Sequence, residues 1–301
     1  MYSERLKTWI KKYTPNSAYR FLYRAYKYWE VFVLRRPTSV SLVSFVSPQF
    51  RTVQYGVLNF SILLNPENGS IDKEIFLQSS WEPDAVAIMQ EYISPTSVCL
   101  DVGANIGHHT LVMALCAPQG SVHAFEPLPR LCAQIEKSIH QNGLKNIQVH
   151  PYALSNATSD YRIHTSLLNI GKATLDDRDE GGPIEVVSVK RFDDIWNGTE
   201  VVSFVKIDVE GHEYAALQGM EDMLRRDTPV IFFEYSPVFY VKNGTNARAL
   251  LEFLFAYGYR IFDCAHNKEE ITPDTLDTFM AACTFQTNLL CVPKTLYVTK
   301  N

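Results

Sequence analysis

The chain has 301 residues, of which 46% are hydrophobic and 20% are charged, and this balance excludes an intrinsically disordered protein. The net charge of −5 is unevenly spread, because residues 1–36 carry nine Lys or Arg against two Glu, a net of +7, which leaves −12 on residues 37–301. So acidic a body predicts no nucleic-acid partner, and no apolar run reaches the roughly 20 residues that span a bilayer.

The six cysteines are scattered through apolar runs without a C-x-x-C pair. This pattern excludes a zinc site and a disulfide framework, and it is typical of a reducing compartment. The N-terminus is too charged and too aromatic for a secretory signal. We therefore expect a cytoplasmic protein; the sequence predicts no particular oligomeric state.

The N-terminal segment shows aromatic and aliphatic residues at helical spacing between Tyr19 and Val33, with Arg20, Arg24 and Lys27 on another face. Such a helix either makes peripheral contact with an anionic membrane through residues 1–36 or packs on the main domain, and packing is favoured. Residues 40–64 predict two or three strands, and residues 65–70 a turn. We therefore expect residues 1–80 to form an extension of one helix and short strands, followed by a domain at 81–301.

From residue 81 onward, strands and helices alternate. Helices are expected at 82–92, 107–116, 128–142 and 245–257, and one after residue 212 with Leu217, Met220 and Leu224 facing inward. Strands are expected at 97–103, 121–127, 146–150, 184–189, 201–208, 229–234, 259–263 and 285–292. This alternation predicts an α/β fold, with a mainly parallel sheet covered by helices on both faces. In such sheets, ligands bind beyond the carboxyl ends of the strands.

The first strand of this region ends in Asp101, followed by a turn that contains Gly103 and Gly107. A dinucleotide-binding turn has no acid at this point because pyrophosphate is anionic, whereas Asp101 would attract a cation. The alternative is an ordinary strand–helix turn in which Asp101 bonds local backbone. The second strand ends in Glu126, which could accept both hydroxyls of a ribose or simply begin a helix. Together, Asp101 and Glu126 fit S-adenosylmethionine better than NAD.

The stretches CLDVGANIGHHT, HAFEPLPR, VHPYALS, NIGKAT, VKIDVEGHE and PVIFFE resemble the ordered motifs of the FkbM-type S-adenosylmethionine-dependent methyltransferases. The resemblance covers roughly residues 81–263. It implies a Rossmann-like class I methyltransferase fold with a seven-stranded sheet containing one antiparallel strand. It also implies O-methylation of a sugar, glycan or polyketide-like small molecule. By position, it places Asp101, Gly103, Asn105 and Gly107 against the methionine half, Glu126 at the ribose, and Ala153 and Leu154 near the adenine.

The acids after the strand at 201–208 are the candidates for a general base. Methyl transfer to a hydroxyl needs alignment of the nucleophile and removal of its proton. Asp208 ends the strand and is the favoured base, with Glu210 and His212 as weaker candidates. Glu213 is expected only to begin a helix.

A second role for Asp208 is metal binding. Glu234 ends the next strand, so the two carboxylates could lie side by side and hold Mg²⁺. Residues 169–174 could form a flap over the acceptor or a simple turn. The alternatives to a methyltransferase are an enzyme that uses NAD or a nucleotide sugar, and a non-catalytic module that binds S-adenosylmethionine.

Overall fold

A computed structural model describes residues 47–164, 184–197, 199–265 and 268–296. The chain divides into two compact units, Met1–Ser47 and Pro48–Asn301, and the elements below belong to the second. The predicted N-terminal helix and the predicted flap at 169–174 lie outside the described residues. The predicted domain boundary at residue 80 stays a prediction.

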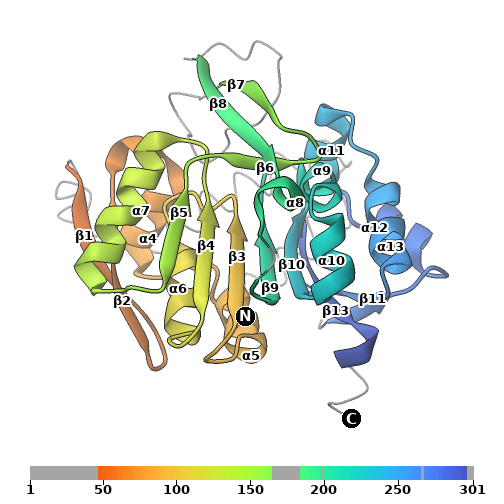
Figure 1. Ribbon diagram of the computed structural model, residues 1–301, viewed down its shortest axis with the longest axis horizontal. Helices are drawn as coiled ribbons and strands as arrows, with labels where there is room; N and C mark the ends of the chain where they lie inside the picture. Colours follow the sequence, from red (N-terminus) through yellow and green to blue (C-terminus); the bar gives the residue numbers. More distant parts are fainter. Residues whose placement is uncertain (1–46, 165–183, 198, 266–267, 297–301) are drawn as a thin grey trace, which may run out of the picture. The chain divides into compact units, whose positions relative to one another are not determined.

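The main sheet has eight strands in the order β12-β11-β13-β10-β9-β3-β4-β5 (Figure 1). Neighbouring strands from β10 to β5 are parallel, whereas β13 is antiparallel to both β10 and β11. The mainly parallel class I methyltransferase sheet is thus confirmed, and β12 adds an eighth strand that pairs antiparallel with β11. The strands are β3 (Val98–Val102), β4 (Ser121–Phe125), β5 (Ile147–His150), β9 (Val202–Ile207), β10 (Val230–Tyr235), β11 (Tyr259–Asp263), β12 (Glu269–Ile271) and β13 (Thr287–Pro293).

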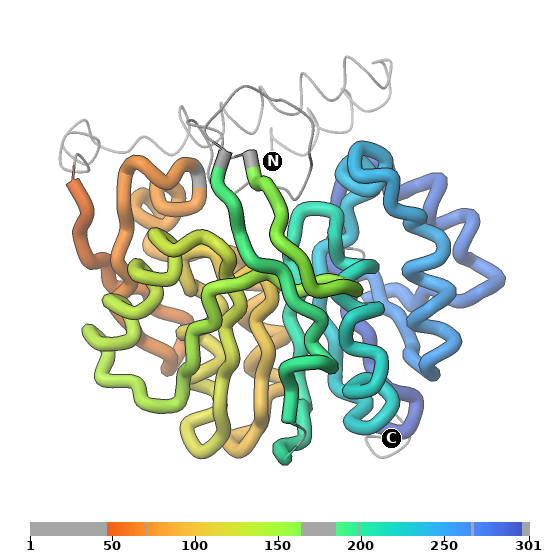
Figure 2. The backbone as a smooth tube through the Cα atoms, turned by 45° about the horizontal axis from the view of Figure 1, so that its top comes forward, coloured from red at the N-terminus to blue at the C-terminus, as the bar shows by residue number. Residues whose placement is uncertain are grey.

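Two smaller sheets accompany the main one. The sequence predicted two or three strands at residues 40–64, and the structure shows two described strands there, β1 (Gln49–Tyr55) and β2 (Leu58–Leu64), which pair as an antiparallel hairpin. A three-stranded sheet joins β6 (Ala153–Ser155), β8 (Ile184–Arg191) and β7 (Ser159–His164), in that order. In Figure 2, β7 and β8 run side by side away from the main sheet.

Within the described residues, the helices predicted from residue 81 onward are present, with one difference and several short additions. The helix expected after residue 212 is two helices, α9 and α10, which are separated at Gly219 and Met220. Gly143 closes α7 in a left-handed conformation, as predicted. The helices are η2 (Pro66–Asn68), α4 (Ser70–Gln78), α5 (Pro83–Tyr92), α6 (His108–Cys116), α7 (Pro129–Asn142), α8 (Phe192–Ile195), α9 (Glu213–Gln218), α10 (Glu221–Asp227), α11 (Pro237–Asn243), α12 (Ala247–Ala256) and α13 (Leu276–Ala282).

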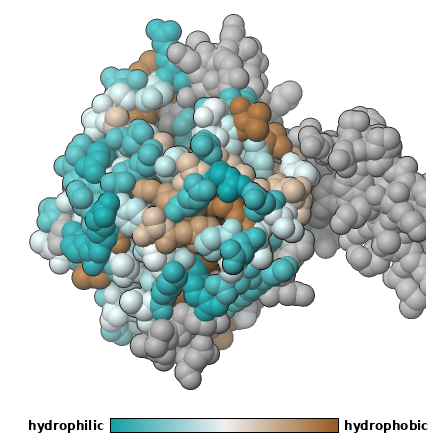
Figure 3. All heavy atoms as spheres, turned by 90° about the vertical axis from the view of Figure 1, so that its right-hand side faces the viewer, coloured by the Kyte–Doolittle hydropathy of each residue, from teal (hydrophilic) through white to brown (hydrophobic). Residues whose placement is uncertain are grey.

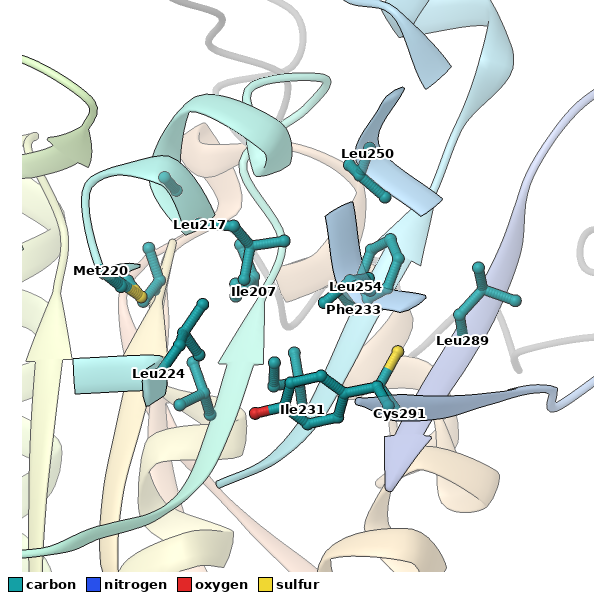
Figure 4. Packing of buried hydrophobic residues seen from close by; sticks show 14 of the residues in the cluster. Ile207, Leu217, Met220, Leu224, Ile231, Phe233, Leu250, Leu254, Leu289 and Cys291 are labelled. Carbon is teal, nitrogen blue, oxygen red and sulfur yellow. The ribbon is translucent and has the colours of Figure 1, made fainter. Parts of the chain in front are cut away.

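Among the described residues, one hydrophobic core lies between one face of the sheet and helices α9, α10 and α12. Alternate residues of each strand point to opposite faces, so Ile207, Ile231 and Phe233 pack against Leu217 and Leu254 (Figure 4). The residues in between point to the opposite face, where Thr110 of α6 bonds Asp101 of β3. The polar strand residues of the candidate site therefore belong to the face covered by α6.

The described surface carries several large hydrophobic side chains. Figure 3 shows hydrophobic residues among hydrophilic ones on the side of the C-terminal helices. Val238, Val241 and Phe285 are among the exposed large hydrophobic residues. Within the described ranges, no helix combines the length and the apolarity needed to cross a membrane. All six cysteines are free thiols.

Candidate active site

The strands β3 and β9 place a buried lysine between two acids. Asp101 and Lys206 are cross-strand partners, and the side chain of Lys206 is only 6% exposed. Its Nζ lies 3.4 Å from Oδ1 of Asp101 and 3.6 Å from Oδ2 of Asp208, and it donates a hydrogen bond of 3.1 Å to the carbonyl of Gly103. One ammonium thus holds together the ends of both strands.

Burial disfavours the charged form of Lys206, but the nearby carboxylates of Asp101, Asp208 and Glu82 outweigh this effect and raise its pKa above the ordinary value. Lys206 is therefore a permanent cation. Sequence reasoning missed this residue, although a single lysine inside the apolar run 202–207 was a usable signal, because an unpaired charge is not tolerated in a buried strand.

Asp101 is fully buried, with no exposed surface. Its Oδ2 accepts a hydrogen bond of 2.6 Å from the hydroxyl of Thr110, and Lys206 faces its Oδ1. The sequence predicted that Asp101 would attract a cation, and the structure supplies that cation from within the protein. Contact between Asp101 and the methionine half of a cofactor stays a prediction.

The turn after β3 brings the backbone of the β9 loop very close. Gly103 has φ +80°, and a Cβ at this position would lie 1.9 Å from the carbonyl oxygen of Asp208. Glycine is required here because two backbones touch. Asn105 also has positive φ, and Gly107 precedes α6 against Ile135 of α7. The predicted contacts of Gly103, Asn105 and Gly107 with the methionine half remain untested.

Glu126 follows β4 and is 5% exposed. Its two carboxylate oxygens accept backbone N–H groups, Oε2 from Asn105 at 2.9 Å and Oε1 from Leu128 at 3.0 Å. Burial raises the pKa of Glu126 to about 7, although both hydrogen bonds act in the opposite direction. Each oxygen keeps a lone pair that can accept a further hydrogen bond, so Glu126 is able to bind the hydroxyls of a ribose. Its contact with a ribose stays a prediction.

The two residues predicted near the adenine, Ala153 and Leu154, lie in β6. Both are buried, and Leu154 belongs to the hydrophobic core that packs against α9, α10 and α12. They pair with Val189 and Lys190 of β8. Their contact with an adenine stays a prediction.

The loop after β9 is fixed by backbone hydrogen bonds. The N–H of Asp208 donates to the carbonyl of Val102 at 3.0 Å. Glu213 is fully buried, and its Oε1 accepts the N–H groups of Val209 and Gly211, both at 3.1 Å. Glu213 therefore does more than begin α9, because it locks the loop that carries Asp208. Burial raises the pKa of Glu213 to about 7.

The three candidate bases differ in their surroundings. Asp208 has a side chain that is 38% exposed and lies beside Lys206. Asn243 donates from Nδ2 to the carbonyl of Glu210 at 3.0 Å, which fixes the orientation of its amide, and the same Nδ2 lies 3.3 Å from Nδ1 of His212. Nδ1 of His212 therefore accepts, so its lone pair is already used. This arrangement favours Asp208 over His212 as the base.

Glu234 lies in β10 next to Phe233, which pairs with Ile207 of β9, so Glu234 comes beside Asp208 as predicted. Burial, followed by the charges of Asp208, Glu210 and other nearby acids, raises the pKa of Glu234 well above its ordinary value. Gln286 donates a hydrogen bond to its Oε1. Among the described residues, no group of three or more His, Cys, Asp or Glu side chains is placed to hold a metal ion. The Mg²⁺ considered for Asp208 and Glu234 needs only two carboxylates and water, so it stays a prediction.

Comparisons with known proteins agree with this geometry. Residues 101–261 match the family described as "Methyltransferase FkbM domain". Relatives include Methyltransferase 1 of Beauveria bassiana, 29% identical over 54% of this chain and 73% of that protein. The hexuronic acid methyltransferase AglP of Haloferax volcanii is 28% identical over 48% of this chain and 58% of that protein. The 31-O-demethyl-FK506 methyltransferase FkbM of Streptomyces tacrolimicus is 30% identical over 43% and 62%, respectively.

The chain thus spans less than two thirds of two of these relatives. A crystal structure of methyltransferase FkbM from Methylobacillus flagellatus aligns with a TM-score of 0.43 at 16% identity, over 72% of this chain and 52% of that one. The family match covers more than half of the sequence and contains every predicted site residue from Asp101 to Glu234. The chain belongs to the FkbM methyltransferase family and is an S-adenosylmethionine-dependent methyltransferase.

Proposed function

We propose that this enzyme methylates a hydroxyl group of a sugar, a glycan or a polyketide-like small molecule, with Asp208 as the general base. The observation that carries this proposal is the position of Asp208, a half-exposed carboxylate at the end of β9 on a loop that Glu213 and Val102 hold in place. One relative is named for 31-O-demethyl-FK506, which supports an oxygen of a small molecule as the acceptor, and another is named for a hexuronic acid, which supports a sugar.

The residues present fit a cationic methyl donor. The carboxylates of Asp101 and Asp208 outnumber the single ammonium of Lys206 at the ends of β3 and β9. When bound, S-adenosylmethionine supplies a methyl group already activated on a sulfonium. Glu126 would hold the ribose, and Asp208 would take the proton of the acceptor hydroxyl as the new bond forms. Lys206 keeps Asp208 in place, and the proposed proton transfer to Asp208 requires no metal ion.

The first test separates binding from catalysis. Calorimetric titration with S-adenosylhomocysteine should give micromolar affinity, and a flat titration with both the donor and this product would contradict the proposal. With a panel of radiolabelled glycan acceptors, Asp208→Asn should lower kcat by about 10²- to 10⁴-fold, the usual contribution of a general base. The matched control is Asp274→Asn, an exposed carboxylate that should leave the rate unchanged. Full activity of Asp208→Asn would remove Asp208 from the mechanism.

Membership of the family favours methyl transfer over an enzyme that uses NAD or a nucleotide sugar, and turnover in this assay would exclude a non-catalytic module. We propose no nucleic-acid partner and place the reaction in the cytoplasm. Peripheral membrane contact through residues 1–36 remains a prediction about residues outside the described ranges.

A further inference from the structure

Glu82 lies just before α5, outside the part of the chain that matches the family. Its side chain is 34% exposed, and its Oε2 lies 3.5 Å from Nε2 of the buried His109. It is close enough to Asp208 and Lys206 for their charges to act on it. A carboxylate from a segment far upstream in the sequence is thus brought to the ends of the β-strands.

Tyr55, at the end of β1, fixes the backbone just before Glu82. Its hydroxyl accepts the N–H of Trp81 at 2.5 Å, lies 2.6 Å from the carbonyl of Trp81, and lies 2.9 Å from Nε2 of His108. The hydroxyl has one proton and donates it in the hydrogen bond to the carbonyl of Trp81, because a carbonyl oxygen can only accept. His108 must then donate from Nε2. Burial lowers the pKa of His108 to about 3, so His108 is neutral and carries its proton on Nε2.

This bonding explains an unfavourable conformation. Glu82 has φ 42° and ψ 61°, a left-handed region that residues other than glycine rarely adopt. Both backbone groups of Trp81 are bonded to the hydroxyl of Tyr55, and these bonds hold the chain in place just before the left-handed Glu82. Tyr55 therefore sets the direction of the Glu82 side chain.

Among the described residues, Glu82 has no positively charged partner of its own. Burial, followed by the charges of His108 and Lys206, lowers the pKa of His109 well below its ordinary value, so this neighbour is neutral. Asp208 repels Glu82, and Lys206 is already bound between Asp101 and Asp208. Asp101 has no exposed surface with which to meet a ligand. A positively charged group of the ligand would complete this arrangement.

We propose that Glu82 binds the ammonium at the amino-acid end of S-adenosylmethionine and that Tyr55 is the residue that positions it. The proposal rests on the proposed function, since it assigns part of the cofactor to a residue outside the matched family region. It also assigns a separate role to each acid: Asp101 neutralises Lys206, Asp208 accepts the proton of the acceptor hydroxyl, and Glu82 binds the ammonium of the methyl donor.

The test compares two ligands that differ only in the amino-acid end. S-adenosylhomocysteine carries the ammonium, whereas 5′-methylthioadenosine has the same nucleoside and sulfur without it. Glu82→Gln should weaken binding of S-adenosylhomocysteine by about 10- to 100-fold, the range for one hydrogen bond to a charged group, and leave 5′-methylthioadenosine unchanged. The control is Glu91→Gln on the same helix, which removes an exposed ion pair with Lys268 and should change neither affinity.

Tyr55→Phe tests the positioning role. It should reduce the preference for S-adenosylhomocysteine over 5′-methylthioadenosine in the same direction as Glu82→Gln, which a general loss of stability would not do; thermal denaturation measures that loss separately. Failure of the wild type to bind S-adenosylhomocysteine would refute the proposed function. Wild-type binding that Glu82→Gln leaves intact, or that it weakens equally for both ligands, would refute only the assignment of Glu82.

Discussion

At the scale of single residues, the site is organised around Lys206. Sequence reasoning identified Asp101 and Asp208, because an acid at the end of an apolar strand is conspicuous. It did not identify the ammonium between them, because pairing depends on which strands are neighbours, and β3 and β9 are about 100 positions apart in the sequence. Glu82 was missed for the same reason, since its placement depends on Tyr55.

Removal of the buried ammonium should be costly. Lys206→Met leaves Asp101 buried without its counter-charge, and loss of one partner of a buried pair typically costs about 3–5 kcal/mol of unfolding free energy. Urea denaturation followed by circular dichroism measures this loss. Asp101→Asn in the same chain removes the orphaned charge, so the double variant should be more stable than Lys206→Met alone. Strict additivity of the two changes would show that the two side chains do not interact.

At the scale of elements, the long apolar strands and amphipathic helices were predictable because their patterns are local. The short elements were not: β6 and β12 have three residues each, too few for a period to show. The break between α9 and α10 was also missed, although Leu217, Met220 and Leu224 do face the core. A Cβ on Gly219 would lie 2.0 Å from the carbonyl oxygen of Ser155 in β6, a tertiary contact that no local pattern reveals.

This contact predicts an unusual response to alanine. Gly219 has φ −72°, where alanine is normally the better residue, yet Gly219→Ala forces the α9–α10 junction away from β6. We expect a loss of up to about 3 kcal/mol, as in overpacked cores. Gly143→Ala is the contrasting variant, because the position has open space and only its left-handed φ of 66° opposes a side chain, at a cost of about 1 kcal/mol. Thermal denaturation ranks the two, and a harmless Gly219→Ala would contradict the close packing.

At the scale of the whole molecule, several of the acids that make the sequence acidic are buried, and burial changes their pKa values. Burial raises the pKa of Asp72 to about 6 and that of Glu82, Glu126 and Glu213 to about 7. Burial also lowers the pKa of two buried or partly buried histidines, to about 3 for His108 and about 4 for His150. The acids favour the folded state at low pH and the histidines favour it at higher pH, so the two sets oppose each other between about pH 4 and 7.

A single substitution should isolate the contribution of one buried acid to the pH dependence of stability. The pKa of Glu213 is about 7 in the folded protein and 4.5 when unperturbed, so the folded state holds a proton that the unfolded state loses between these values. Its stabilising contribution is therefore complete below about pH 4.5 and is lost as pH rises to about 7. Glu213→Gln can still accept the two backbone N–H groups but cannot titrate. Its unfolding free energy, relative to wild type, should therefore increase with pH across this window, by on the order of 1 kcal/mol per unit of pKa shift. Urea titrations at pH 4.5, 5.5, 6.5 and 7.5 measure the difference, and a constant value would show that the pKa of Glu213 is the same in the folded and unfolded protein.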